Sequence, residues 1–272
     1  MWLRSLIKPE PGMAVAYVDY SSMEFLIAAS LSDGHCGSVN TMLDMYETGD
    51  PYLSFAKRVG AVPNTATKAS HAEVRDKYKT MLLAVQYGMA RDTLAARLGV
   101  SSFEAHQMLN QHRELFAQYW QWSDDWVQHA LQDGIMYTAF GWYCRTGITE
   151  FNERSIRNWP VQATGADILR IACILAMRHG VKLVAPVHDA VMIEAPVERI
   201  DADAALMREI MCRASRIVLN ADAAGSHKLR TDCTIIRYPD SYSDKRGVKI
   251  WAEVVALLGQ CRPAAMAATE VA

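Results

Sequence analysis

The stretch Gly12–Tyr20, GMAVAYVDY, decides the fold. Small or apolar residues alternate along it up to an acid, Asp19, and this alternation predicts a strand over Ala14–Asp19. Ser21 comes next, followed three residues later by Glu24, which is the capping-box pattern of a helix start. A strand, an acid and a helix are therefore expected to follow one another here.

From residue 50 to residue 130 nearly all local signals are helical. A second capping box, Ser70–Glu73, predicts a helix that runs to about Tyr87 and stops at Gly88. Two more helices are expected over about 102–116, capped by Ser101 or Ser102, and over about 119–134. Aromatic residues cluster at the start of the last helix with a spacing that favours core packing over base stacking: Phe116, Tyr119, Trp120, Trp122 and Trp126.

Strand and helix signals mix after Gly134. Residues 137–143 favour a strand, 165–179 and 201–219 favour helices, and 229–237 alternate as a strand. Two short apolar runs, 182–187 and 190–194, flank His188-Asp189 and predict a hairpin with this polar pair at its tip. The predicted fold class is α+β: a small antiparallel sheet with helices behind it, and a mostly helical block inserted between its first and later strands.

Composition excludes several classes of protein. The 272 residues carry 28 Lys+Arg against 30 Asp+Glu, and 51% are hydrophobic, as in an ordinary globular chain. We expect no membrane span, because Arg170 interrupts the longest apolar run, and no signal peptide at the N-terminus. Six scattered cysteines without a CxxC pair indicate reduced thiols in a cytoplasmic protein. The near-neutral charge argues against nucleic-acid binding by bulk charge.

Two acids occupy matching places at strand ends: Asp19 closes the first strand and Asp189 lies at the hairpin tip. Neighbouring strands would bring the carboxylates within about 4 Å, where they repel unless a cation lies between them. Mg²⁺ suits such oxygen ligands, since it binds one or two carboxylates together with substrate phosphates. Strand-end aspartates also cap turns, and spacing by itself favours that explanation.

The helix that starts near Ser70 carries Arg75, Lys79, Leu83 and Tyr87 at four-residue spacing, so they share one face. The two cations would grip a triphosphate, and the two residues after them offer an apolar and an aromatic surface to a nucleobase. A solvated amphipathic helix with ordinary surface charges explains this periodicity at least as well.

Arg154, Asn158 and Gln162 repeat the four-residue spacing, and Pro160 predicts a break or kink between the last two. Long polar side chains suit the reading of base edges or sugars in a shallow groove. From spacing, helix capping and a polar surface are the favoured explanation.

Taken together, these residues resemble DNA polymerase family A, the bacterial DNA polymerase I group. The matching motifs are Val18–Glu24 (VDYSSME) for motif A, Arg75-x3-Lys79-x3-Leu83-x3-Tyr87-Gly88 for motif B, Val187-His188-Asp189 for motif C, and Arg154-x3-Asn158-x3-Gln162 for the stretch before motif C. Their order and internal spacing agree with the family, over roughly residues 4–239.

The resemblance implies a template-directed DNA polymerase that adds dNTPs to a primer 3′-hydroxyl by a two-metal mechanism. It implies that Asp19 and Asp189 hold two Mg²⁺ ions, with the backbone carbonyl of Tyr20 as a further ligand. Lys79 would protonate the leaving pyrophosphate.

The resemblance also implies contacts with nucleotide and DNA. Arg75 and Lys79 would bind the triphosphate, Leu83 and Tyr87 would lie near the base and sugar, and Glu24 would disfavour ribonucleotides by crowding the 2′ position, with the Tyr87 hydroxyl within its reach. The primer-template near its terminus would contact Arg154, Asn158, Gln162 and His188.

Three positions depart from the family pattern. Leu83 replaces the usual Phe or Tyr, so we expect altered discrimination against sugar analogues. Ala190 replaces the Glu that usually follows His-Asp, which removes one charge near the metals. Leu26 stands where motif A often has Arg.

The resemblance implies a palm from residues 1–30 and 136–245, a fingers block over 31–135, and a C-terminal helix and tail over 246–272. Because motif A lies within roughly the first 20 residues, neither a thumb nor a proofreading exonuclease domain is expected. A missing upstream segment of that kind would be a partner, and polymerisation by the chain would be weak without it.

Two other functions stay open from the sequence. A catalytically inactive, truncated remnant that binds nucleic acid or a partner would not need to keep dNTP binding. A single-subunit RNA polymerase shares the Asp, Lys, Tyr and His-Asp positions, but Glu24 disfavours it.

Overall fold

The computed structural model describes residues 5–35, 40–146, 152–219, 228–243 and 247–260. The chain divides into two compact units. The first, here called the sheet unit, comprises Met1–Val18, Ala176–Arg208 and Cys233–Ala272. The second, the helical unit, comprises Asp19–Leu175 and Glu209–Asp232.

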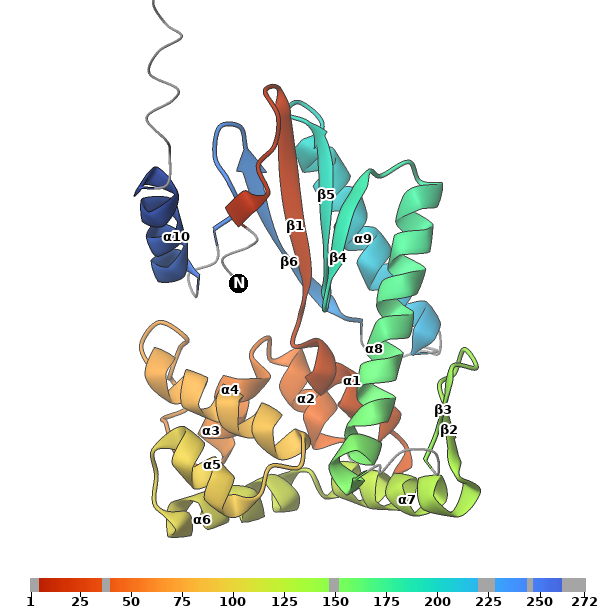
Figure 1. The fold of residues 1–272 in the computed structure, drawn as a ribbon. Coiled ribbons are helices and arrows are strands. Elements are labelled where there is room, and N and C mark those ends of the chain that lie inside the picture. Colours follow the sequence, from red (N-terminus) through yellow and green to blue (C-terminus); the bar gives the residue numbers. More distant parts are fainter. Residues whose placement is uncertain (1–4, 36–39, 147–151, 220–227, 244–246, 261–272) are drawn as a thin grey trace, which may run out of the picture. The chain divides into compact units, whose positions relative to one another are not determined.

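The sheet unit is built on a four-stranded sheet with the strand order β4-β5-β1-β6 (Figure 1). The strands are β1 (Met13–Ser21), β4 (Leu183–Val187), β5 (Ala190–Pro196) and β6 (Arg230–Arg237). β4 and β5 form the predicted antiparallel hairpin, in which Val187 pairs with Ala190 across a two-residue turn. Just past β5, Val197 N donates to Gly12 O before the start of β1, so β5 and β1 are antiparallel as well.

Apolar side chains cover both faces of this sheet. One face carries a buried cluster with partly buried residues packed against it: Val15, Met192 and Ile236, then Ile7, Tyr17 and Tyr242. On the other face of β1, Ala14, Ala16 and Val18 have no exposed surface. Helix α9 (Ile200–Val218) begins beside β6, where Arg237 Nη2 donates to Asp201 Oδ2 (2.7 Å). The last described element is α10 (Val248–Gln260).

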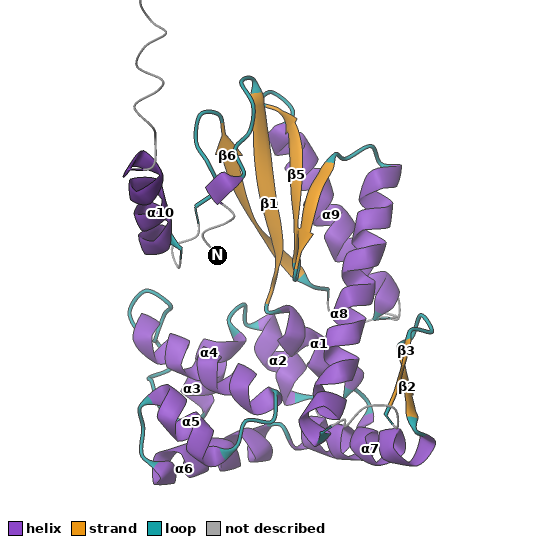
Figure 2. Ribbon diagram, viewed as in Figure 1, coloured by secondary structure: helices purple, strands orange, loops and turns teal. Residues whose placement is uncertain are grey.

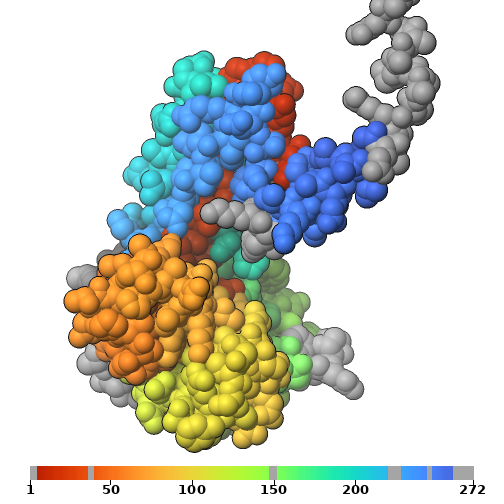
Figure 3. Space-filling view, turned by 90° about the vertical axis from the view of Figure 1, so that its left-hand side faces the viewer, coloured from red at the N-terminus to blue at the C-terminus, as the bar shows by residue number. Residues whose placement is uncertain are grey.

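The helical unit contains the helical block that the sequence predicts between the first and later strands (Figure 2). Its elements are α1 (Met23–Leu31), α2 (Thr41–Glu47), α3 (Pro51–Arg58), α4 (Ala72–Gln86), α5 (Arg91–Leu98), α6 (Ser102–Leu115), α7 (Ala117–Asp133), the hairpin of β2 (Ile135–Tyr137) and β3 (Tyr143–Arg145), and most of α8 (Glu153–Arg178). Helices α3 to α6, orange to yellow in Figure 3, pack into one continuous surface.

Aromatic rings form the core of the helical unit. Phe25 from α1 and Phe55 from α3 both pack on Phe116, with ring centroids 5.8 Å and 5.5 Å from it. All three are 2% exposed or less. Tyr119 is equally buried, whereas Trp120, Trp122 and Trp126 are partly buried. The predicted core role of the aromatic cluster is therefore confirmed, most clearly for its first two members.

Both predicted capping boxes are wrong. α1 has Ser22 as its N-cap, without a side-chain capping bond, because Ser21 Oγ donates instead to Asp232 Oδ2 (2.7 Å). α4 has His71 as its N-cap, again without a side-chain bond, and Ser70 Oγ donates back to Thr67 O. In both places the serine satisfies a nearer partner.

The third predicted cap is confirmed: Ser101 Oγ accepts from Glu104 N at the start of α6 (3.1 Å). The strand predicted over 137–143 is wrong, because these residues are the ends of β2 and β3 and the turn between them. Thr138 fixes this turn, since its N donates to Trp142 O and its Oγ1 accepts from Trp142 N.

Helix α8 is continuous through Pro160, so the predicted alternative of a break is wrong, whereas a kink stays a prediction. Pro160 and its neighbour Val161 are buried, and their packing compensates for the lost backbone hydrogen bond. Among the described residues, α8 is the one helix long and apolar enough to cross a membrane. Ile156, Ile168 and Ala172 are at most 1% exposed, as expected for the core helix of a globular protein.

Four of the six cysteines are free thiols: Cys144, Cys173, Cys212 and Cys233. The other two, Cys36 and Cys261, lie outside the described residues, as does the tail from residue 263 onward. The expected C-terminal helix is present as α10.

The buried imidazole of His112 makes stability depend on pH. Burial lowers the pKa of His112 to about 3, and its Nδ1 accepts a hydrogen bond from Trp120 Nε1 (3.0 Å). The unfolded state, with a pKa of about 6.5, takes up a proton that the folded state refuses, so stability falls as the pH drops from 6.5 toward 3. We expect His112 to lower the free energy of unfolding by about 2 kcal/mol between pH 7 and pH 5.

Urea unfolding at both pH values measures this effect. His112→Gln should lose that part of the pH dependence, whereas His106→Gln, at an exposed histidine of the same helix, should keep it. An unchanged pH dependence in His112→Gln would contradict the assignment.

Candidate functional site

Along the end of β1, every second side chain is partly exposed and the others are buried. Val18 and Tyr20 are at most 2% exposed, whereas Asp19 and Ser21 are partly exposed. The hydroxyl of Tyr20 donates to Met211 O (2.8 Å), which anchors this buried side chain. Burial raises the pKa of Tyr20 well above the ordinary value. The strand therefore directs Asp19 and Ser21 to the same face.

Two residues next to the predicted acids have left-handed backbone. Ser22 (φ 55°) follows the end of β1, and His188 (φ 58°) directly precedes Asp189. They are the two non-glycine residues with positive φ in the part of the chain that the structure describes. Such conformations are strained for residues with a Cβ and concentrate at functional sites.

Asp189 and His188 form the predicted two-residue tip of the β4–β5 hairpin. The side chain of Asp189 is 35% exposed, and its Oδ1 lies 3.3 Å from His188 Nδ1. Asp189 belongs to the sheet unit and Asp19 to the helical unit. Across the described ranges, no three His, Cys, Asp or Glu side chains are grouped as metal ligands.

Arg75 and Lys79 lie on α4 as predicted, and both flank the ring of Tyr52 on α3. The guanidinium carbon of Arg75 is 5.2 Å from the ring centroid and Lys79 Nζ is 5.7 Å from it. Tyr52 is 3% exposed, so the ring is a fixed base for the two cations. The sequence did not predict a role for Tyr52. This residue lies on a different helix from Arg75 and Lys79, so no helical spacing connects it with them.

Arg75 is engaged within the protein. Its Nε donates to Asp50 Oδ2 (2.8 Å) and its Nη1 donates to Asp76 Oδ1 (2.9 Å). Burial lowers the pKa of Arg75, but these two carboxylates outweigh burial and the pKa lies above the ordinary value. Asp50 also caps α3, where its Oδ1 accepts from Leu53 N. The guanidinium is therefore held in place before any ligand binds.

Three predicted residues from distant parts of the chain meet at one hydrogen-bonded junction. Gln162 Nε2 donates to Glu24 Oε1 (2.9 Å) and lies 3.0 Å from Tyr87 Oη. Burial and the hydrogen bond to Glu24 raise the pKa of Tyr87 well above the ordinary value, so its phenol stays protonated. The expectation that the Tyr87 hydroxyl reaches Glu24 is confirmed. We call Glu24, Tyr87 and Gln162 the junction.

The other two residues of the polar series lie against the same end of α4. Asn158 Nδ2 donates to Tyr87 O (3.4 Å). A Cβ built on Gly88 would lie 3.2 Å from Arg154 Cγ, so glycine at position 88 leaves room for the close approach of α8 to the end of α4. The uninterrupted helix α8 therefore stacks Arg154, Asn158 and Gln162 along one neighbour.

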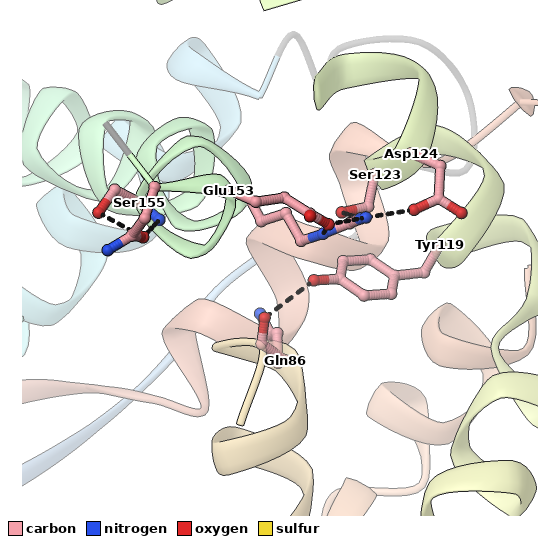
Figure 4. Close-up of polar contacts among 8 residues, drawn as sticks. Gln86, Tyr119, Ser123, Asp124, Glu153 and Ser155 are labelled. Carbon is pink, nitrogen blue, oxygen red and sulfur yellow. Dashed lines mark hydrogen bonds and ion pairs between the residues drawn. The ribbon is translucent and has the colours of Figure 1, made fainter. Parts of the chain in front are cut away.

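Side chains of α7 and α8 form further hydrogen bonds and ion pairs next to this region (Figure 4). Tyr119 Oη donates to Gln86 O (3.3 Å), and Gln86 Nε2 donates to Glu24 O (3.0 Å). Arg157 donates to Ser123 Oγ, to Asp124 and to Glu153. Arg157 is thus paired with protein acids and is not a free cation.

A cavity of about 760 Å³ opens beside the junction in the helical unit. Its wall includes Gly88, Arg113, Trp120 and Arg154. The Arg113 guanidinium carbon is 4.5 Å from the Trp120 ring centroid. The cavity wall is thus rich in cations and aromatic surface.

Comparison with known proteins identifies the relatives of this chain. The family model described as DNA polymerase family A matches residues 2–229. The chain is 27% identical over 221 residues to the thermostable DNA polymerase I of Thermus aquaticus. This alignment covers 77% of the chain and 26% of the Thermus protein. It is 28% identical over 228 residues to DNA polymerase I of Chloroflexus aurantiacus, covering 77% and 23%. It thus spans about a quarter of these curated relatives.

A solved structure agrees with this result. The POL domain of Pol1 from M. smegmatis, in complex with DNA primer-template and dNTP, has a TM-score of 0.70 and 25% sequence identity to this chain. The match covers 86% of this chain and 41% of that one.

The approach of α8 to α4 can be tested at Gly88. Gly88→Ala adds a Cβ both at a φ of 71° and at 3.2 Å from Arg154 Cγ, whereas Gly99→Ala adds one at a φ of 65° in open space. We expect strain to lower the free energy of unfolding by about 1–2 kcal/mol in each variant, and by more in Gly88→Ala.

Urea unfolding of both variants, alone and combined with Arg154→Ala, separates strain from contact. The difference between the two glycine variants should disappear in the Arg154→Ala background. Equal losses in both single variants would contradict the close approach of the helices.

Proposed function

The chain belongs to DNA polymerase family A, and on that basis we propose that it catalyses template-directed addition of dNTPs to a primer 3′-hydroxyl. The observation that carries this proposal is the junction. Glu24 of motif A, Tyr87 of motif B and Gln162 of the stretch before motif C are linked by contacts of 2.9 and 3.0 Å. Glu24 and Gln162, 138 positions apart in the chain, are thus in direct contact, which supports the proposal.

We propose that two Mg²⁺ ions bind between Asp19, Asp189 and the Tyr20 carbonyl. The donor set fits this ion, because two carboxylates and a carbonyl are hard oxygen ligands that leave positions open for substrate phosphates. When bound, the ions would lower the pKa of the primer hydroxyl and neutralise charge on the phosphates. The antiparallel arrangement of β5 and β1 supports the pairing, since β5 starts after Asp189 at the sheet end where β1 finishes.

Arg75 and Lys79 are the proposed triphosphate ligands. Tyr52 holds both cations over one ring, which fixes them a helical turn apart. A triphosphate would take the place of the Asp50 and Asp76 carboxylates as the partner of Arg75. Lys79 is exposed and is the proposed donor of the proton to the leaving pyrophosphate.

The junction is proposed to shape the sugar and base pocket. Gln162 fixes the Glu24 carboxylate by a hydrogen bond, so Glu24 cannot swing away from an added 2′-hydroxyl without losing it. Tyr87 would lie beside the base, together with the partly buried Leu83.

The proposed DNA contacts are those of the polar series and the hairpin tip: Arg154, Asn158, Gln162 and His188. Arg154 and His188 are exposed, so both are accessible to a phosphate backbone. In this proposal residues 1–30 and 136–245 form the palm, residues 31–135 form the fingers, and residues 246–272 form the C-terminal helix and tail. The proposed partners are primer-template, dNTPs and an upstream thumb segment, in the cytoplasm.

The first test is primer extension with Mg²⁺. Asp19→Asn and Asp189→Asn should each lower the rate by about 1,000-fold or more, because each removes a carboxylate from the proposed metal site. Asp240→Asn, at an exposed acid of the sheet unit, is the matched control and should extend normally.

Extension by the unchanged chain that is no faster than by Asp189→Asn would refute catalysis by this chain. That result would favour the second function, a catalytically inactive remnant. A measurement of Mg²⁺-dependent dNTP binding distinguishes the two functions, since a remnant need not retain this binding.

The second test concerns sugar selection. Glu24→Ala should raise the ratio of rNTP to dNTP incorporation by about 10- to 100-fold, because one steric contact in a pocket contributes about 1–3 kcal/mol of discrimination. Single-nucleotide insertion rates give this ratio directly. Glu73→Ala, an exposed acid on α4, should leave the ratio unchanged. Equal ratios in Glu24→Ala and the unchanged chain would remove Glu24 from this role.

A further inference from the structure

Three groups hold the last residue of β1 in place. Ser21 Oγ donates to Asp232 Oδ2 on β6 (2.7 Å), and Tyr46 Oη on α2 lies 3.4 Å from Ser21 O, to which it donates. Arg230 N donates to Tyr46 Oη (2.9 Å), and the Arg230 guanidinium carbon lies 3.9 Å from the centre of that ring. All of these residues belong to the helical unit, as does Asp19.

This arrangement fixes the side of the sheet on which Asp232 lies. Asp19 and Ser21 are two residues apart in a strand, so their side chains project from the same face. The burial of β1 agrees, because both are partly exposed and Tyr20 between them is buried. Since Ser21 Oγ contacts Asp232, the Asp232 carboxylate lies on the face that carries Asp19. Asp232 is exposed, and the Ser21 side chain that it contacts lies about 7 Å along β1 from that of Asp19.

We propose that Asp232 is a third acid of the divalent-cation site, acting through its charge on the face of Asp19. This inference rests on the proposed function and extends it to a residue on a different strand. The position after Asp189 is Ala190, which is fully buried and contributes no charge. Asp232 would supply negative charge from the opposite neighbour of β1.

The size of the effect follows from Coulomb's law. A single charge about 7 Å from a divalent ion in a water-like dielectric changes the ion's affinity by roughly five-fold at an ionic strength of about 0.01 M, and by less at higher salt. The hydrogen bond to Ser21 shows that the carboxylate lies on the face of Asp19. Direct coordination is not required for an effect of this size.

Mn²⁺ titration of the full chain at an ionic strength of about 0.01 M, followed by electron paramagnetic resonance, tests the proposal without turnover. Asp232→Asn keeps an oxygen that accepts the Ser21 hydrogen bond but removes the charge, so it should bind Mn²⁺ about five-fold more weakly. Asp232→Glu keeps the charge and should bind within two-fold of the unchanged chain. Asp133→Asn, at an exposed acid on α7, should bind as the unchanged chain does.

Ser21→Ala separates charge from positioning, because it removes the hydrogen bond and leaves both carboxylates. Its affinity should stay within two-fold of that of the unchanged chain. An equal loss in Ser21→Ala and Asp232→Asn would overturn the proposal in favour of a purely structural contact.

Asp19→Asn distinguishes failure of this inference from failure of the proposed function. If Asp19→Asn weakens Mn²⁺ binding and Asp232→Asn does not, Asp232 is no part of the site and the proposed function stands. If neither weakens binding, the proposed metal site is wrong and the inference falls with it.

Discussion

The alternation of buried and partly exposed residues at the end of β1 is the constraint on which the rest of the site depends. Its buried face consists of Ala14, Ala16, Val18 and Tyr20, none more than 2% exposed. A shift of one residue in register would turn Asp19 onto this buried face. The small side chains allow close packing on that face, and the Tyr20 hydroxyl bond to Met211 fixes the strand's end. The orientation of Asp19 is thus determined by apolar residues that have no chemistry of their own.

The second constraint is the contact between α8 and the end of α4. Gly88 permits it, because any Cβ there would press on the Arg154 side chain. Once the helices are this close, four-residue spacing on α8 meets successive groups of α4: Arg154 at Gly88, Asn158 at the Tyr87 carbonyl, and Gln162 at the Tyr87 hydroxyl. From the sequence, the four-residue spacing of these polar residues could be explained as a polar helix surface. In the structure, the same residues contact the end of α4.

Sequence patterns predicted the elements well where one physical effect dominated. The alternation of β1, the hairpin around His188-Asp189 and the helical spacing on α4 were each sufficient. The two capping-box failures came where two partners compete for one group. Ser21 and Ser70 have capping-box spacing, yet each bonds to a partner outside the helix start. A capping pattern records only what a serine can reach along the chain, whereas Asp232 is 211 positions away.

The same limit applies to the residues that the sequence did not find. Tyr52 and Asp50 join α3 to α4, and Asp232 and Arg230 bring β6 to α2 and the end of β1. A sequence pattern can identify only residues that have a fixed spacing inside one helix or turn. The contacts of these four residues form between different elements, so no such pattern marks them. For candidate sites of this kind, local motifs identify the groups that react, and tertiary contacts identify the groups that hold them.

The distribution of charge explains how a chain with a formal net charge of -2 can suit polyanionic ligands. Arg75 and Arg157 have side chains only 14% and 12% exposed, and each is paired with carboxylates. The near-neutral charge follows from similar numbers of basic and acidic residues, and pairing holds these two guanidinium groups in fixed positions. In the proposed function, a triphosphate would carry more charge than the carboxylate it replaces, so exchange of partners at Arg75 would favour the ligand without a strong field at long range. Bulk charge is therefore a poor guide to this chain, because its cations act at contact distance.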